Sequence, residues 1–330
     1  MKAFLYGFIS LCLLGAIAAA AGAYWVGQQL DTAGPLRNET VITVDQGTSV
    51  SSISKTLEKQ NVISNHILFQ IATRLKEADT KLRAGEYSVP PRTSINGVID
   101  ILVSGKMHQY KITIQEGLNS YQIVDILNKN EILTGEIETI PHAGTLFPET
   151  YHFTRGTSKA TLIERMRDKM ENTINAEWEK REESPYIKNK DQALTLASII
   201  EKETNKNSER QKVAGVFINR LKRGMKLQTD PTTIYALTEG GKKPLGRPLY
   251  IKDLKTVHPY NTYHIEGLPP GPIAHPGEDS IVAALHPEKH SYLYFVADGT
   301  GGHKFARSLK EHNRNVAAWR KYKRSLKKKK

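Results

Sequence analysis

Two glutamates, Glu201 and Glu203, stand at the end of a mostly apolar run that begins at Ala193. A carboxyl group at the edge of an apolar wall loses hydration, which disfavours its charged form and raises its pKa above about 4.3. Such an acid keeps its proton near neutral pH and can serve as a general acid in sugar chemistry. The alternative is a solvated helix end, the more ordinary meaning of a Glu-Lys-Glu sequence.

The helical phase of this run separates the two glutamates. On a helix over residues 191–204, Glu203 follows Ile199 and Ile200 by one turn and so continues the most apolar stripe. Glu201 continues a smaller and more polar stripe. The phase therefore predicts that Glu203 is the carboxylate at the edge of the core, with a raised pKa, and that Glu201 is a partner or a structural residue.

The elements around the pair can also be read from local signals. Asp191 is the predicted N-cap of the first helix, and Ser208 opens a predicted capping box for a second helix that stops near Gly224. Beyond Met225 the chain is rich in Gly, Pro and Tyr, which predicts loops, and the alternating stretch 292–296 predicts a closing strand.

Several longer motifs follow one another in this half of the chain. Together with the apolar N-terminal segment they resemble the endolytic murein transglycosylase family (YceG-like), and the likeness extends to about Arg314. The motifs are LASIIEKET at 196–204, S-E-R at 208–210, VFINRL at 216–221, LQTDPT at 227–232, YNTY at 260–263, GLPPGPI at 267–273, YFVADG at 294–299 and G-H at 302–303.

The resemblance implies an enzyme of the cell wall. It implies a lytic transglycosylase, a carbon–oxygen lyase that cuts the MurNAc-GlcNAc bond within nascent peptidoglycan glycan strands and terminates their elongation. The product carries a 1,6-anhydroMurNAc end, because the muramic 6-hydroxyl attacks its own anomeric carbon. The catalytic glutamate of the family matches Glu203. The implied partners are glycan strands and peptidoglycan synthases, and no cofactor is implied.

This chemistry needs one carboxyl group rather than two. Hydrolytic glycosidases use a pair of carboxylates about 5–9.5 Å apart. Here Glu203 alone would protonate the leaving oxygen and then accept the proton of the attacking hydroxyl, with the geometric advantage of an intramolecular attack. A different class of protein stays open as an alternative: a non-catalytic scaffold that binds the cell wall and recruits synthesis proteins.

Holding the sugar requires amide, carboxylate and aromatic side chains. Each candidate also has a plain alternative as a turn residue or, for Glu201, as a structural group. Four histidines in the later loops match no metal-binding spacing, so the sequence predicts no metal site. The predicted substrate-binding residues are Glu201, Gln228, Asp230, Tyr235, Asn261 and Tyr263.

The N-terminal half alternates strand, turn and helix signals and predicts a small α+β region, in which the resemblance implies a LysM-like domain. The predicted fold class is α+β, with an N-terminal transmembrane helix and a lytic-transglycosylase-like mixed α/β catalytic domain. The predicted organisation is an anchor at 1–27, a linker at 28–40, a LysM-like glycan-binding domain at 41–108, the catalytic domain at 109–320 and a basic tail at 321–330.

Residues 4–26 carry no charge, and crossing a bilayer takes about 20 apolar residues. A cleaved signal peptide is the alternative. The flanking charges favour a cytoplasmic N-terminus and an extracytoplasmic bulk. The resemblance implies a single-pass protein of the inner (cytoplasmic) membrane with this bulk facing the periplasm. Cys12 is the only cysteine, so a disulfide within the chain is excluded.

The net charge is +13, and part of it lies in the lysine-rich tail. Such a run is usually a solvated, disordered tail, although it also attracts anionic lipid headgroups or wall polymers. Nucleic acid is disfavoured as a partner, because the bulk is expected outside the cell and no aromatic residues are interleaved as in a nucleic-acid-binding surface.

Overall fold

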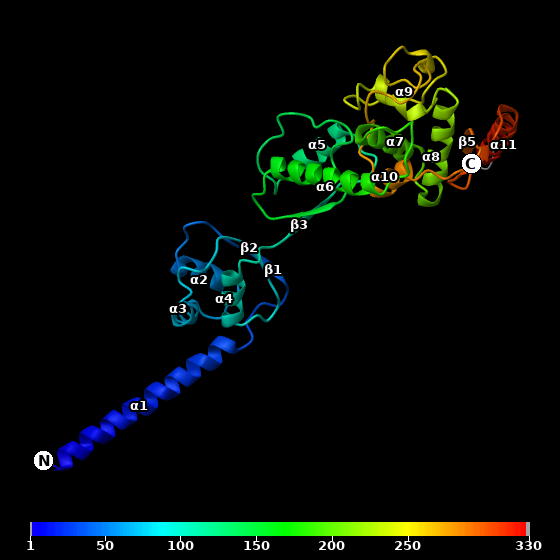
Figure 1. Ribbon diagram of the computed structural model, residues 1–330. Coiled ribbons are helices and arrows are strands. Elements are labelled where there is room, and N and C mark those ends of the chain that lie inside the picture. The colour runs from blue at the N-terminus through cyan, green and yellow to red at the C-terminus, as the bar shows by residue number, and fades with distance from the viewer. Residues whose placement is uncertain (1, 328–330) are drawn as a thin grey trace. The chain divides into compact units, whose positions relative to one another are not determined.

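The computed structural model describes residues 2–327 and begins with one long helix, α1 (Lys2–Asp31), drawn in blue in Figure 1. Residues 4–31 of α1 are long and apolar enough to cross a membrane, and the apolar window that meets this test is not buried against the rest of the protein. The chain divides into two compact units. The first contains the residues up to Tyr110 and His152–Arg155, and the second contains Lys111–Tyr151 and the chain from Gly156 onward.

The first unit packs three helices against a strand pair. β1 (Thr40–Val44) and β2 (Gly85–Val89) are antiparallel, with Ile42 opposite Tyr87, and both of these side chains are buried. The helices are α2 (Val50–Lys59), α3 (His66–Leu75) and α4 (Ile95–Ser104). Serine or asparagine side chains cap each helix, which satisfies orphan backbone N–H groups.

The predicted linker at 28–40 is not a free tether in the structure. α1 continues to Asp31, whose carboxylate accepts a hydrogen bond from Asn96 at 2.7 Å. Leu30 and Leu36 are buried in the core of the first unit. These two apolar side chains hold the end of α1 against the first unit. The sequence does not reveal this, because the rest of the segment is mostly polar.

The second unit is built around α7 (Lys190–Glu203), the helix that carries both glutamates. It contacts helices on several sides, and Leu196, Ile199 and Ile200 are fully buried. Its neighbours are α6 (Lys159–Glu179), α8 (Asn207–Lys222), α9 (Asp230–Leu237) and α10 (Glu278–Leu285). The remaining elements from Tyr110 onward are β3 (Tyr110–Thr113), α5 (Ser120–Asn128), β4 (Thr150–Phe153), a short 3₁₀ helix (Asp253–Lys255), β5 (Tyr294–Ala297), β6 (His303–Ala306) and α11 (Leu309–Lys327).

Several local predictions need correction. Asn189 rather than Asp191 caps α7, and α8 begins at Asn207 with no side-chain cap, so the capping box predicted at Ser208 is absent. α9 and α10 lie where loops were predicted. Pro231 explains the first of these, because a fixed φ and a missing N–H suit the first turn of a helix as well as a turn.

The C-terminal region also differs from the prediction. α11 runs to Lys327, so most of the tail predicted to be disordered is helical, and the last three lysines lie outside the described residues. Pairs of strands, β1–β2, β3–β4 and β5–β6, form the sheets within residues 2–327. The mixed helix-and-sheet architecture with one N-terminal apolar helix is therefore confirmed, whereas the LysM-like and transglycosylase-like domain names stay predictions.

Candidate active site

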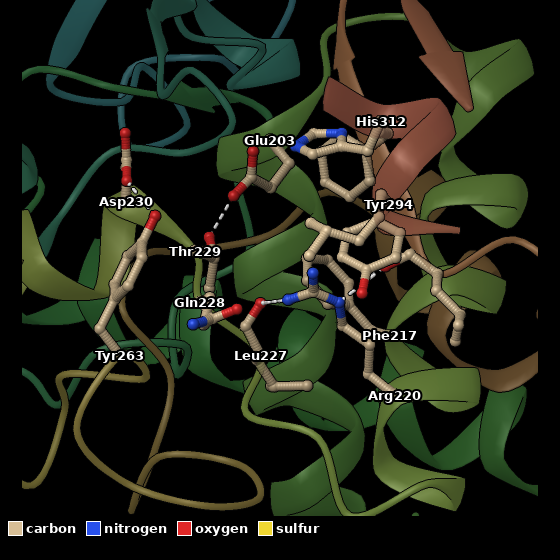
Figure 2. A pocket seen from close by; sticks show the side chains of 13 residues that line it. Glu203, Phe217, Arg220, Leu227, Gln228, Thr229, Asp230, Tyr263, Tyr294 and His312 are labelled. Atoms are coloured by element: carbon tan, nitrogen blue, oxygen red, sulfur yellow. Dashed lines mark hydrogen bonds between the residues drawn. The ribbon is translucent and has the colours of Figure 1, made fainter. Parts of the chain in front are cut away.

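Glu203, the last residue of α7, lines a cavity of about 380 Å³ in the second unit (Figure 2). This volume lies within the range of small-ligand sites, about 300–1,000 Å³. The wall is assembled from α7, α8, the loop that enters α9, the strand β5 and the start of α11. The lining residues are Glu203, Phe217, Arg220, Leu227, Gln228, Thr229, Asp230, Tyr263, Leu293, Tyr294, Phe295, Leu309 and His312.

The Glu203 carboxyl group is half-buried and accepts a hydrogen bond from the Thr229 hydroxyl. Burial raises the pKa of Glu203 above its usual value, and the charge of Asp230 adds to the rise. The Thr229 hydrogen bond and the positive charges of His303 and Arg220 oppose that rise in pKa. Desolvation is the largest contribution, so Glu203 has the property expected of a general acid.

The position of the Thr229 hydroxyl is fixed by two other buried threonines. The Thr229 N–H donates to Thr262 Oγ1 at 3.0 Å, and Thr232 Oγ1 donates to the Thr229 carbonyl at 2.7 Å. The Thr232 and Thr262 hydroxyls lie 2.8 Å apart. The preceding residue, Gln228, has a φ of 50°, a left-handed conformation that is uncommon outside glycine and that often accompanies functional sites.

Arg220 joins the loop before α9 to the strand region on the other side of the cavity. Its Nε donates to the Leu293 carbonyl at 2.7 Å, and its Nη1 donates to the carbonyls of Lys226 at 3.1 Å and Leu227 at 2.7 Å. The guanidinium lies 5.1 Å from the centre of the Tyr294 ring. Within residues 2–327 it has no carboxylate in an ion pair, so backbone carbonyls and an aromatic face compensate its charge.

Asp230 and Tyr263 form the opposite part of the wall in Figure 2. The Tyr263 hydroxyl donates to Asp230 Oδ1 at 2.7 Å. Burial raises the pKa of Tyr263, and the neighbouring carboxylate strengthens the effect, so the phenol stays protonated and remains a donor. The carboxylate of Asp230 is exposed to solvent and keeps capacity for further hydrogen bonds.

Comparison with known proteins now identifies the chain. The model of the YceG-like family matches residues 42–318. The chain belongs to the YceG-like family. The resemblance seen in the sequence motifs is thereby confirmed.

Curated relatives of this YceG-like chain carry a shared name. A Bacillus subtilis (strain 168) protein named endolytic murein transglycosylase is 36% identical over 309 residues, covering 83% of this chain and 82% of the relative. A Streptococcus pneumoniae (strain D39) protein of the same name is 29% identical over 372 residues, covering 96% of this chain. This chain spans 65% of the length of that streptococcal relative.

A solved structure is also similar. The crystal structure of a YceG-like protein from Listeria monocytogenes superposes with a TM-score of 0.51 at 33% identity. The match covers 84% of this chain and 99% of the Listeria chain.

In this YceG-like structure, Glu201 lies outside the Glu203 cavity. Its carboxylate is buried, accepts a hydrogen bond from Arg210 Nη2 at 3.2 Å and accepts another from the Gly277 N–H at 3.1 Å. Burial raises the pKa of Glu201, while the Gly277 N–H and Arg210 oppose the rise. These contacts tie the end of α7 to α8 and to the start of α10.

Two other predicted substrate contacts also lie outside the cavity. Tyr235 packs on Tyr260, with ring centres 4.8 Å apart. Asn261 is fully buried; its Oδ1 accepts from Thr233 Oγ1 at 2.8 Å, and its amide nitrogen donates to backbone carbonyls of the preceding loop. Its hydrogen-bonding groups are thus occupied in folding that loop.

The structure brings together Glu203 and three of the predicted substrate-binding residues, namely Gln228, Asp230 and Tyr263. Sequence reasoning missed Thr229, although it lies between two predicted residues. It also missed Arg220, whose quoted motif was treated as an ordinary helix. His312 carried no local signal, because its place beside the cavity depends on how α11 packs against β5 and β6.

Proposed function

We propose that this chain is an endolytic peptidoglycan lytic transglycosylase that cleaves the MurNAc-GlcNAc bond and leaves 1,6-anhydroMurNAc ends. The observation that carries the proposal is a carboxyl group with a raised pKa, Glu203, at the wall of a cavity in a YceG-like chain. The names of the Bacillus and Streptococcus relatives support the substrate class.

In the proposed reaction, Glu203 donates its proton to the glycosidic oxygen while the bond from that oxygen to the muramic anomeric carbon breaks. The muramic 6-hydroxyl oxygen then bonds to the same carbon, and its proton passes to the Glu203 carboxylate. Glu203 thus ends the cycle protonated, and no water is consumed. General acid–base catalysis of this kind contributes about 10²–10⁴-fold to a rate.

The other polar residues of the wall are proposed to hold the sugar. Gln228 and Asp230 are exposed at the cavity and can bind hydroxyl groups, while Tyr263 presents a ring face beside them. The negative charge of Asp230 also favours an oxocarbenium-like transition state. Glu201, Tyr235 and Asn261 are better explained as residues that shape the surrounding fold.

The rest of the molecule fits an enzyme held at a membrane. We propose that α1 is a single-pass anchor of the cytoplasmic membrane, with the N-terminus inside and both units outside the cytoplasm. The first unit is proposed to be a LysM-like glycan-binding domain and the second a lytic-transglycosylase-like domain. Nascent glycan strands are the proposed partner, and peptidoglycan synthases are the proposed source of these strands.

Mass analysis of products tests the reaction class. The full chain, reconstituted in detergent or lipid, is incubated with uncrosslinked glycan strands. We expect shortened strands that end in 1,6-anhydroMurNAc, with a mass lower than a hydrolysed end by one water. Hydrolysed ends would replace the proposal with glycoside hydrolysis, and binding to sacculi without any product would favour the scaffold alternative.

A further inference from the structure

The C-terminal half of α11 carries a cluster of positive charge, called here the basic face. It consists of Arg320, Lys321, Lys323 and Arg324, all of which are exposed. None of the four forms an ion pair with any other described residue. The one acidic residue of the helix, Glu311, lies at its opposite end. The charge of the basic face is therefore available to a partner outside the chain.

Apolar side chains share this half of the helix, on its other side. Trp319, Tyr322 and Leu326 recur with helical spacing, and the rings of Trp319 and Tyr322 stack with centres 5.8 Å apart. Tyr322 reaches the β5–β6 turn, where its hydroxyl lies 3.4 Å from the Gly299 carbonyl. Leu326, further along, is 46% exposed. The apolar stripe thus begins against the β5–β6 turn and continues beyond it to the exposed side chain of Leu326.

A basic helix with an adjoining apolar stripe suits a surface that is anionic outside and apolar beneath. We propose that the C-terminal half of α11 binds the anionic phospholipid surface of a membrane. The same chain carries a helix that is long and apolar enough to cross a bilayer, which favours a lipid surface over other anionic partners. An anionic wall polymer offers the charge but no apolar layer for Leu326.

The chain offers a clean way to observe this helix. Since α1 holds the protein in any bilayer, binding of the whole protein is uninformative and the signal must come from α11 itself. Cys12 is the only cysteine. The double variant Cys12→Ser, Ser325→Cys therefore places one environment-sensitive fluorophore on exposed Ser325, beside the basic face.

The labelled full-length protein is reconstituted in nanodiscs of phosphatidylglycerol or of phosphatidylcholine. We expect a blue-shifted, salt-sensitive emission in the anionic discs only. Adding Arg320→Gln, Lys321→Gln, Lys323→Gln and Arg324→Gln should lower the ratio of bound to free α11 in the anionic discs, read from the size of the shift, by about tenfold or more, because each basic group near such a surface adds attraction. The matched control neutralises exposed lysines elsewhere: Lys55, Lys59, Lys111 and Lys188.

Three results would overturn the proposal: an equal shift in both lipids, an unchanged shift in the basic-face variant, or an equal loss in the control. Anionic wall polymer or inorganic phosphate that produces the same shift in phosphatidylcholine discs would also overturn it, since the partner would then be phosphate rather than a membrane. Glycan cleavage in detergent should be unchanged, because none of the four residues lines the Glu203 cavity.

An independent observation concerns the proton of Glu203. Thr229 Oγ1 donates to Glu203 Oε1, and its hydroxyl has no other hydrogen bond to the described residues. Since its only proton is directed at Oε1, that oxygen acts as an acceptor. Resting on the proposed function, we infer that Thr229 is a positioning residue that leaves Glu203 Oε2 to carry the catalytic proton.

The same hydrogen bond tunes the acidity of Glu203. It stabilises the charged carboxylate and so lowers the pKa that burial raises. Removing the hydroxyl should raise the pKa of Glu203 further and move the fall of kcat/KM at high pH to a higher pH. The titratable or charged groups that face this site from the packed elements are Asp230, His303, Arg220, Tyr263, Tyr294 and His312.

Substitution of Thr229 tests this inference. Thr229→Val keeps the shape and removes the donor, and we expect the plateau of kcat/KM to fall by about tenfold or more as the high-pH limb moves upward. Thr229→Ser should restore both values toward wild type. Thr238→Val is the matched control, because Thr238 is also buried, bonds only to backbone carbonyls and lies outside the cavity.

Failure of this inference is distinct from failure of the proposed function. A folded Thr229→Val protein with the wild-type plateau and pH limb, beside an inactive Glu203→Gln protein, would overturn the role of Thr229 alone. Equal losses in folded Thr229→Val and Thr229→Ser proteins would overturn it as well. Full activity in Glu203→Gln would instead overturn the proposed function.

Discussion

Glu201 and Glu203 are separated by a single residue on α7, yet their surroundings differ. Burial raises the pKa of both carboxyl groups. Glu201 is the more deeply buried, and the cation of Arg210 and a backbone N–H bind its two oxygens. Glu203 has one neutral donor, Thr229, and lines a cavity. A raised pKa is therefore common to both, and access to a substrate distinguishes the candidate acid.

The largest expected effect separates the two residues in catalysis. Glu203→Gln keeps the shape of the side chain and removes the proton donor, so the rate of anhydro product formation should fall by about 10²–10⁴-fold. Glu164→Gln, at an exposed position of α6, serves as the control and should leave the rate unchanged. A wild-type rate in Glu203→Gln would remove the central distinction between the two glutamates.

The free energy of unfolding should change in opposite directions in Glu201→Gln and Glu203→Gln. Glu201→Gln leaves Arg210 buried without its closest buried counter-charge, and two of its nitrogens, Nε and Nη1, already lack hydrogen-bond partners among the described residues. We expect the free energy of unfolding to fall by about 1–3 kcal/mol. Denaturant unfolding followed by circular dichroism measures the change.

For Glu203→Gln the expected change in the free energy of unfolding has the opposite sign. The pKa of Glu203 is higher in the folded protein than in the unfolded chain, so the folded protein keeps a proton that the unfolded chain has already released. The free energy of unfolding therefore decreases as the pH rises from the unfolded pKa through the folded pKa. Replacement by a neutral amide removes this loss, and the free energy of unfolding at neutral pH should increase. An increase in both variants would mean that burial alone, rather than the partners, governs the pair, and a decrease in Glu203→Gln would contradict the expected sign.

Arg220 offers a smaller effect of a different kind. Arg220→Lys cannot reproduce a guanidinium fork that binds the carbonyls of Lys226, Leu227 and Leu293. We expect a loss of about 1–3 kcal/mol in unfolding free energy together with a lower rate, because the loop that carries Thr229 loses its attachment. Arg223→Lys, an exposed control one turn on, should change neither quantity.

The smallest expected effect lies at the rim of the cavity. Tyr263→Phe removes the hydroxyl that donates to Asp230 and keeps the ring. The lost hydrogen bond is worth about 1 kcal/mol, which corresponds to a few-fold change in kcat/KM. A loss as large as that of Glu203→Gln would show that the Tyr263 hydroxyl takes part in the reaction alongside Glu203, and not only at the rim.

Sequence patterns predicted the elements better than the contacts between them. The N-terminal half was predicted to alternate strand, turn and helix, and β1, β2 and α4 confirm this alternation. The phase argument chose between Glu201 and Glu203 by assuming that α7 has one apolar face. In the structure α7 is buried on several sides, so Glu201 is also enclosed. Its charge partner is Arg210 on the next helix, α8, and the local pattern of neither helix predicts this ion pair, which decides the role of Glu201.

The cavity shows the same limit. Gln228, Asp230 and Tyr263 could be proposed because their side-chain types suit sugar binding. Thr229 could not, because its value lies in a hydroxyl aimed at Glu203 and in a backbone fixed by Thr232 and Thr262. Asn261 shows the converse: its amide suits a sugar, but in the structure its hydrogen bonds go to Thr233, Tyr263 and the preceding loop, which sequence patterns do not reveal.

The central claim is that Glu203 supplies a proton because burial raises its pKa and the cavity gives it a substrate. The pH dependence of kcat/KM for anhydro product formation tests this most directly, in wild type and in Glu201→Gln. We predict a rate that falls as the pH rises through the raised pKa of Glu203, above the ordinary glutamate value of about 4.3, with the same limb in Glu201→Gln. A rate that rises over this range, or a limb that disappears in a folded Glu201→Gln protein, would contradict the assignment.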